Sequence, residues 1–188
     1  MLDAARLFCA SGCLALAACS PAPQQATPQR AAPAPFSLAE TQTPLKFFSD
    51  VCLQDLPDLA NGRARAARSG FQLASQDDGG QIYRSDSAKP LVVVLADNFE
   101  GNSEKVCGVA FSGPGDAEAV GKLFLAETNK KTGAPRKKYP SSFFNYAYHL
   151  GNGSVATHDV RPRNGQTRHF FLITEPVPES DVPKYIYN

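Results

Sequence analysis

FFNYAYHLGNGSVATHDVRPRNGQTRHFFLIT, residues 143–174, is the stretch that decides the fold. It contains three runs rich in apolar and aromatic side chains, at 143–150, 155–161 and 168–174, each of the length and composition of a β-strand. Gly-Asn-Gly separates the first two runs and Asn-Gly the last two. Asn-Gly between apolar runs is a strong local signal for a β-hairpin. The stretch therefore predicts a three-stranded antiparallel meander.

The residues before the meander predict helices and further strands. Thr43-Pro44 has the hydroxyl and the proline of a helix start, and apolar residues recur at helical spacing as far as Cys52. A second helix is expected over 57–67, ended by Gly70, and a third begins within 112–115. Strands are expected near 71–74, 81–84, 91–96 and 106–111. The sequence thus predicts an α+β fold, in which two N-terminal helices and one mid-chain helix pack against an antiparallel sheet ending in the meander.

A short apolar segment at residues 7–18 ends in Leu16-Ala17-Ala18-Cys19. These residues resemble the lipobox of bacterial lipoproteins, in which the signal peptide is cleaved before the cysteine and the thiol carries lipid. The resemblance implies a signal peptide over 1–18 and a membrane anchor at Cys19. Ser20, in place of the Asp that holds such proteins at the inner membrane, favours the outer membrane, facing the periplasm. The alternative is an ordinary cleaved signal peptide with an incidental cysteine.

Composition divides the rest of the chain. Residues 19–40 are the lipidated cysteine and a tether rich in Pro, Ala and Gln, which lacks the apolar side chains needed to fold. Residues 41–176 have the composition and length of a single globular domain, and no internal repeat is visible in them. Residues 177–188, rich in Pro and acidic side chains, are expected to form a loosely ordered tail.

Two cysteines remain in the predicted mature domain, Cys52 and Cys107. An even number of cysteines in an oxidising compartment predicts a disulfide, and the alternative is two buried free thiols. The segment from Phe47 to Cys52, together with a second cysteine in a strand, resembles many small exported bacterial proteins that have no assigned activity.

The meander holds all three histidines of the chain, His149, His158 and His169. If both hairpins turn on their Asn-Gly pairs, His158 lies opposite Ala147 and Phe171, and the three imidazoles share one face of the sheet. Three neutral imidazoles with an open position suit zinc or copper. The alternative is three unrelated, half-buried strand histidines, because a one-residue slip in either hairpin separates them.

Charge is distributed unevenly along the chain. Residues 40–119 hold twelve acidic and seven basic side chains, whereas residues 120–170 hold nine basic and two acidic ones. Five of the nine lie close together: Lys130, Lys131, Arg136, Lys137 and Lys138. This basic segment is a candidate site for an anionic surface, such as lipid headgroups, an acidic wall polymer or the acidic face of an envelope protein. The alternative is a solvated loop, and nucleic acid is not expected in that compartment.

No catalytic or cofactor motif is recognisable in the sequence. Adjacent His158 and Asp159 cannot form a catalytic dyad, because neighbouring strand residues point to opposite faces. The sequence therefore favours a membrane-tethered envelope lipoprotein with a non-catalytic periplasmic domain that binds a partner or an anionic surface. A periplasmic module for a small molecule or a metal, and a hydrolase with an unrecognised site, are the alternatives.

Overall fold

The computed structural model describes residues 38–77, 79–86, 91–96, 105–163 and 166–187, all within one compact unit. The predicted signal peptide, Cys19 and nearly all of the tether lie outside the described residues, as do the Asn164-Gly165 turn and the turn at 97–104. In the described part of the chain, no helix is both long enough and apolar enough to span a membrane.

The described chain begins with four short helices. They are η1, Leu38–Thr41; α1, Gln42–Phe47; η2, Phe48–Leu53; and α2, Gly62–Arg68. α1 and η2 follow each other without a break, so together they cover the residues expected to form the first helix, from Thr43-Pro44 to Cys52. Phe48 and Val51 of η2 are buried, and this face of the helix therefore belongs to the core.

α2 begins later than the sequence predicts, at Gly62 instead of near Pro57. The residues before it form a turn, in which the N–H of Leu59 donates to the Asp55 carbonyl at 3.0 Å. The end of α2 is as expected: Gly70 has φ +82°, a conformation that glycine adopts without strain, and the buried Phe71 follows it.

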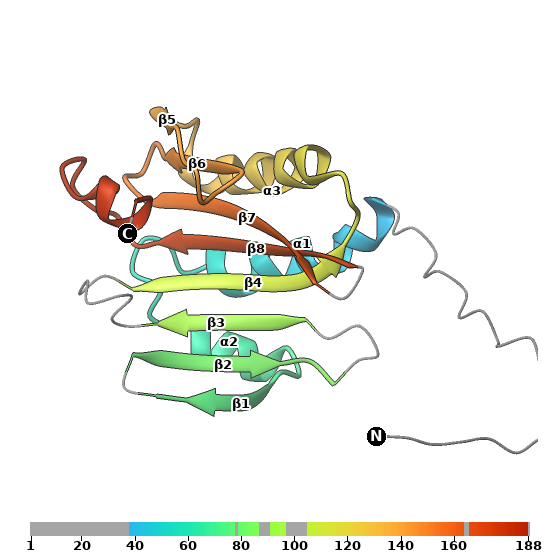
Figure 1. Cartoon of the computed structure of the whole chain (residues 1–188). Coiled ribbons are helices and arrows are strands. Elements are labelled where there is room, and N and C mark those ends of the chain that lie inside the picture. Colours follow the sequence, from blue (N-terminus) through green and yellow to red (C-terminus); the bar gives the residue numbers. More distant parts are fainter. Residues whose placement is uncertain (1–37, 78, 87–90, 97–104, 164–165, 188) are drawn as a thin grey trace, which may run out of the picture. The chain divides into compact units, whose positions relative to one another are not determined.

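Eight strands form a single antiparallel sheet in the order β1-β2-β3-β4-β8-β7-β6-β5 (Figure 1). They are β1, Gln72–Gln76; β2, Gly80–Arg84; β3, Val92–Ala96; β4, Val106–Gly113; β5, Lys137–Tyr139; β6, Tyr146–His149; β7, Val155–Arg163; and β8, Gln166–Thr174. The predicted mixed fold with an antiparallel sheet is confirmed. β5 is an additional edge strand at a place where the sequence predicts none.

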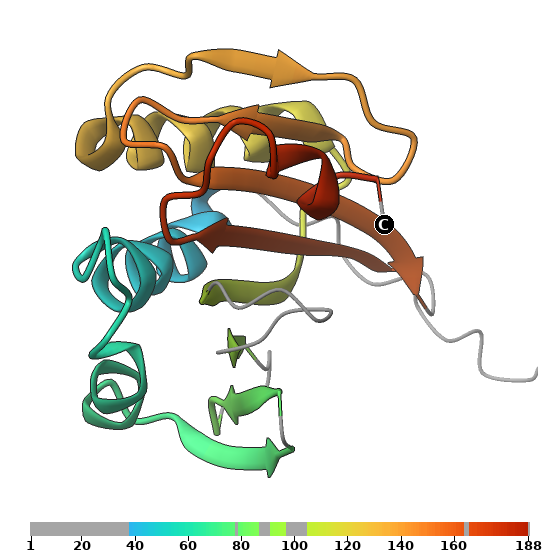
Figure 2. The ribbon, with the colours of Figure 1, turned by 90° about the vertical axis from the view of Figure 1, so that its left-hand side faces the viewer.

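The remaining long element is α3, Ala117–Thr132, between β4 and β5. Its N-terminus is capped by Asp116, whose carboxylate accepts a hydrogen bond from the Ala119 N–H at 2.9 Å. Gly133, at φ +78°, ends the helix. α1, α2 and α3 all lie on the same face of the sheet (Figure 2).

The main core lies between these helices and the sheet. Phe124 of α3 stacks on Phe171 of β8, with ring centroids 3.5 Å apart. Phe48 of η2 packs against both rings, and Phe111 of β4 stacks beside them. Four aromatic rings from both halves of the chain therefore fill the centre of the fold.

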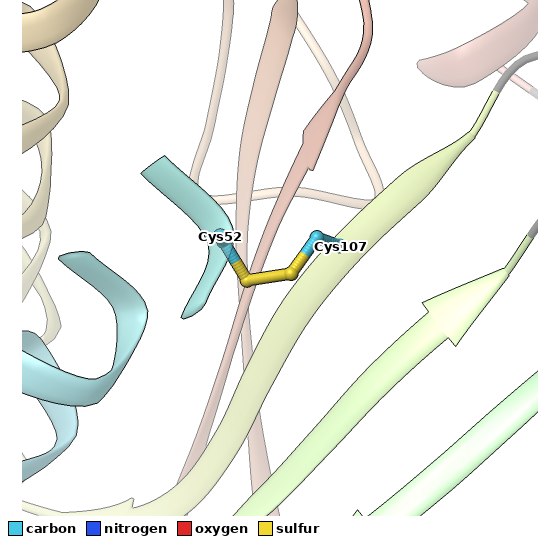
Figure 3. The surroundings of a disulfide bond; sticks show 2 residues. All are labelled: Cys52 and Cys107. Carbon is cyan, nitrogen blue, oxygen red and sulfur yellow. A yellow bond between two sulfur atoms is a disulfide. The ribbon is translucent and has the colours of Figure 1, made fainter. Parts of the chain in front are cut away.

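The predicted disulfide joins Cys52 of η2 to Cys107 of β4, with Cα atoms 5.4 Å apart (Figure 3). Both cysteines are fully buried, at 0 % exposed. The disulfide therefore attaches the N-terminal helices to a central strand of the sheet, from inside the core.

The C-terminal residues differ from the loosely ordered tail that the sequence predicts. They include the short helix η4, Val182–Tyr185, and several of their apolar side chains are buried. Val177, Val182, Tyr185 and Ile186 form a second apolar cluster with Tyr139, Ala147 and Val155 of the sheet. The tail is held to the sheet because these four apolar residues reach the cluster, whereas its prolines and Glu179 stay exposed.

Candidate functional site

The three histidines do not share one face of the sheet, so this prediction is wrong. The β7–β8 hairpin has the predicted register, with His158 opposite Phe171. The register of the β6–β7 hairpin differs from the predicted one by one residue: His158 lies opposite Tyr146, and His149 lies opposite Val155. The intervening loop spans residues 150–154 and is closed by a bond from the Leu150 N–H to the Ser154 carbonyl at 2.8 Å.

A one-residue change of register moves a strand side chain to the opposite face. His149 therefore lies on the face away from the helices, and it cannot meet His158 and His169 at one metal ion. Among the residues that the structure describes, no group of three or more His, Cys, Asp or Glu side chains is placed to hold a metal.

His158 and His169 form a buried hydrogen-bonded pair on the helix side of the sheet. Their rings are stacked, with centroids 5.3 Å apart, and His158 Nε2 lies 3.0 Å from His169 Nδ1. His169 Nε2 lies 2.8 Å from the Pro114 carbonyl, so this nitrogen carries the proton and donates it. Nδ1 of His169 is then an acceptor, and His158 Nε2–H is its donor.

Both imidazoles of the pair are neutral near pH 7. Burial, and then the charge of His169, lower the pKa of His158 to about 3, and burial also lowers the pKa of His169. Nδ1 of His158 has no hydrogen-bond partner among the described residues and faces α3, where a Cβ on Gly121 would lie 3.0 Å from it. The pair thus packs between the loop before α3 and the N-terminal part of that helix, which is a structural role.

The five cations of the basic segment are all exposed, which both a surface-binding region and a solvated loop predict. Lys130 and Lys131 are in the last turn of α3, and Lys137 and Lys138 are on the edge strand β5. Part of their charge is already paired: Lys130 lies 2.6 Å from Glu127 and Lys137 lies 3.5 Å from Glu179. Arg136 donates to the Gly151 carbonyl at 2.6 Å. The segment is therefore less strongly cationic than its sequence indicates.

The face of the sheet opposite the helices carries an apolar surface that the sequence analysis did not identify. We call it the helix-free face because α1, α2 and α3 all lie on the other side, and Figure 1 views it from the front. η4 and the C-terminal tail cover only its end, at Ala147 and Val155. Two rows of cross-strand neighbours form it: Arg84, Val92, Ala110, Phe170 and Asp159, and beside them Ile82, Val94, Gly108, Leu172 and Thr157. Ile82 is 38 % exposed, and the valines of β3 and Phe170 and Leu172 of β8 are half-buried, so apolar side chains of β2, β3 and β8 reach solvent. Gly108 and Ala110 of β4 are buried between them.

Two aromatic side chains from the loop before β6 extend this surface. Phe143 is 61 % exposed, and Phe144 beside it is half-buried. Together with Phe170 and Leu172 they line a cavity of about 230 Å³ over the sheet. Thr157, Asp159 and Arg161 add polar groups to the lining of this cavity. Contiguous exposed apolar patches of this kind are typical of contact surfaces.

Arginines border the helix-free face along one side. Arg161 and Arg168 are cross-strand neighbours, next to the row that ends in Arg84. Arg161 contacts the Asp159 carboxylate through its Nε, and its guanidinium lies 5.5 Å from the centre of the Phe170 ring. Three arginines and the buried Asp159 carboxylate therefore lie at this border, and the exposed Asp86 lies near Arg84.

Comparison with known proteins gives no relative: no family model, no curated protein and no solved structure matches this chain.

Proposed function

We propose that this protein is a lipid-anchored envelope protein whose non-catalytic domain binds an anionic membrane surface through the helix-free face. The observation that carries the proposal is the apolar surface across β2, β3, β4 and β8, with arginines along its border. Apolar patches of this kind occur at protein–protein and membrane contacts. Because the border carries arginines, we expect the face to bind an anionic membrane more tightly than a neutral one.

The chemistry of the surface fits the interface of a bilayer. Phe143 and Ile82 present apolar side chains to solvent, and burying one such side chain stabilises a complex by roughly 1.5–3 kcal/mol. Each arginine near an anionic leaflet adds about 1 kcal/mol. A single side chain therefore contributes little binding free energy, whereas the whole face together contributes a substantial amount.

An anchor at Cys19 would make this weak contact effective. The lipid and the tether predicted from the sequence would hold the domain near a membrane, where its effective concentration is high. The predicted position is the outer membrane, facing the periplasm. The basic segment, Lys130–Lys138, would add long-range attraction to the same surface.

The anchor is tested by Cys19→Ser. We expect the variant to leave the membrane fraction after a high-salt wash, because salt removes electrostatic docking and only the lipid would resist it. A variant that still sediments with membranes after that wash would show that Cys19 does not anchor the chain.

The surface is tested with the Cys19→Ser chain, so that no lipid contributes. Sedimentation with phosphatidylglycerol vesicles should weaken at least about tenfold in the double variant Ile82→Ser and Phe143→Ser. Leu73→Ser is the matched control, because Leu73 is 51 % exposed but pairs with Tyr83 on the helix side. Equal binding of all three proteins would exclude the helix-free face.

The arginines are tested in the same assay. Arg84→Gln with Arg168→Gln should weaken binding to phosphatidylglycerol vesicles by about tenfold and leave binding to phosphatidylcholine vesicles unchanged. The double variant Lys46→Gln with Arg68→Gln, two exposed cations of α1 and α2, removes the same charge and is the matched control. If the control weakens binding as much, the attraction comes from overall charge and not from this face.

A further inference from the structure

A second surface depression lies on the helix side of the sheet, between α3 and strands β5 and β6. We call it the tyrosine groove. It has a volume of about 360 Å³, at the small end of the roughly 300–1,000 Å³ typical of ligand sites. Its polar and aromatic lining includes Glu118, Lys122, Lys138, Asn145, Tyr146 and Tyr148. None of these residues belongs to the helix-free face.

The floor of the groove is fixed by close packing at Gly121. A Cβ at this position would lie 2.8 Å from the Tyr146 ring, so only glycine lets α3 and Tyr146 approach this closely. Behind Tyr146, the rings of His158 and Phe171 lie with centroids 5.1 and 6.3 Å away. The Tyr146 ring is therefore held by the core and forms a rigid surface.

Tyr148 extends this surface toward solvent. Its ring centroid is 5.2 Å from that of Tyr146, and the two planes are tilted by 50°. Burial raises the pKa of Tyr146 well above its usual value, so its phenol stays neutral and can donate a hydrogen bond. Two neighbouring tyrosines thus offer aromatic faces together with hydroxyl groups.

The charges around the groove leave one cation without a carboxylate. Glu118 is paired with Lys122 at 2.6 Å, which also raises the pKa of Lys122. Lys138 lies over the Tyr148 ring, 5.9 Å from its centroid, and no carboxylate in the described part of the chain pairs with it. Asn145, at the exposed rim, supplies both a donor and an acceptor.

We infer that the tyrosine groove binds a sugar ring that carries a carboxylate. The C–H face of a pyranose packs on aromatic rings, and its hydroxyl groups match the amide and the phenols. The carboxylate would take the position beside Lys138. A purely apolar ligand would make no hydrogen bond with the polar rim, and a neutral sugar would lack the charge-assisted contact with Lys138. This site goes beyond the function proposed above and lies apart from the helix-free face; it shares only Lys138 with the basic segment.

Two disaccharides of similar size test the inference by calorimetry on the full chain with Cys19→Ser. The acidic probe is N-acetylglucosaminyl-N-acetylmuramic acid, and the neutral one is N,N′-diacetylchitobiose. We expect saturable binding of the acidic probe, at least about fivefold tighter than the neutral one. Absence of saturable binding of the acidic probe, or equal affinity for the two, would overturn the inference.

Variants assign the binding to the groove. Lys138→Gln should remove the preference for the acidic probe, whereas Lys131→Gln, an exposed lysine outside the groove, should keep it. Tyr148→Ala should weaken binding about tenfold, and Tyr148→Phe, which keeps the ring, should recover most of it. Unchanged binding in Tyr148→Ala would place the site elsewhere and overturn the inference. Phe143→Ser should not affect the sugar, which separates this test from that of the helix-free face.

Discussion

The two halves of the described chain have the same order of elements but are held together differently. In each half, helices precede four antiparallel strands, β1–β4 in the first and β5–β8 in the second, and the halves join where β4 pairs with β8. The first half has helical pieces of four to seven residues and a disulfide. The second has the 16-residue α3, the histidine pair and the C-terminal tail.

The difference follows from helix length. Short helices are marginal by themselves, because forming the first turn is costly and few hydrogen bonds follow it. In the first half a covalent link from η2 to β4 compensates for this. In the second half α3 is long enough to place Val120, Phe124 and Thr128 against the sheet, all buried. The same arrangement is thus stabilised covalently in one half and by packing in the other.

Removal of the disulfide should have the largest effect and should act mainly on the first half. The bond closes a loop with a sequence separation of 55 residues, for which the chain-entropy model gives about 4 kcal/mol of stability. Cys52→Ala with Cys107→Ala should lower the free energy of unfolding by about that amount in urea titrations. A reducing agent should destabilise the native protein similarly and leave the double variant unchanged.

Hydrogen exchange in the double variant tests where the loss falls. We expect η2 and α2 to lose protection before β7 and β8, because only the first half depends on the covalent link. Equal loss in both halves would mean that they unfold as one cooperative unit, and the contrast between them would not hold.

The tail provides the next largest effect, in the second half. Ile186 is 0 % exposed, and Ile186→Ala should lower the free energy of unfolding by about 2–4 kcal/mol through lost burial and a cavity. Ile82→Ala is the control of the same residue type, on the exposed helix-free face, and should cost much less. A small loss of stability in Ile186→Ala would contradict this prediction and would support the loosely ordered tail that the sequence predicts.

The features that the sequence predicts correctly rest on local signals. Gly70 ends α2 because a residue with φ +82° is needed there, and β7 and β8 have the register that the Asn-Gly pair predicts, with His158 opposite Phe171. The disulfide follows from the two cysteines that remain after the predicted processing. Each of these depends on a few neighbouring residues or on simple counting.

The features that it misses depend on contacts between distant segments. The loop from Gly151 to Ser154 has two glycines, so its sequence admits more than one register, and one residue decides the face of His149. β3 is apolar on both sides, Val-Val-Val-Leu-Ala, and does not show which side the helices cover. The tyrosine groove combines α3 with β5 and β6, and no local pattern of residues indicates it.

Acid should weaken the histidine pair, which is particular to the second half. In the folded state the pKa of His158 is about 3, below its value of 6.5 in the unfolded chain, so only the unfolded chain takes up a proton between these values. Stability is therefore complete above pH 6.5 and falls as the pH is lowered, by about 2 kcal/mol from pH 8 to pH 5 for this one group.

Urea titrations at several pH values between 5 and 8 measure the effect. In His158→Leu, the free energy of unfolding should depend less steeply on pH. The lowered pKa of His169 acts in the same direction. The lowered pKa values of Asp55 and Glu127 reduce stability only when the pH falls below their ordinary values of 3.8 and 4.5, so they lie outside this window. An unchanged slope in the variant would show that the pKa of His158 is the same in the folded and unfolded states.

Neutralising the basic segment should have the smallest effect on folding, although it changes four charges of the second half. Lys130, Lys131, Lys137 and Lys138 are exposed, and the ion pairs of Lys130 and Lys137 are on the surface, where such pairs stabilise little. With all four changed to Gln, the melting temperature should move by less than about 2 °C. Binding to phosphatidylglycerol vesicles should weaken, and added salt should produce the same loss in the unmodified segment. A large drop in melting temperature would instead show that these ion pairs help to hold α3 and the tail against the sheet. The second half would then be stabilised by charge as well as by packing.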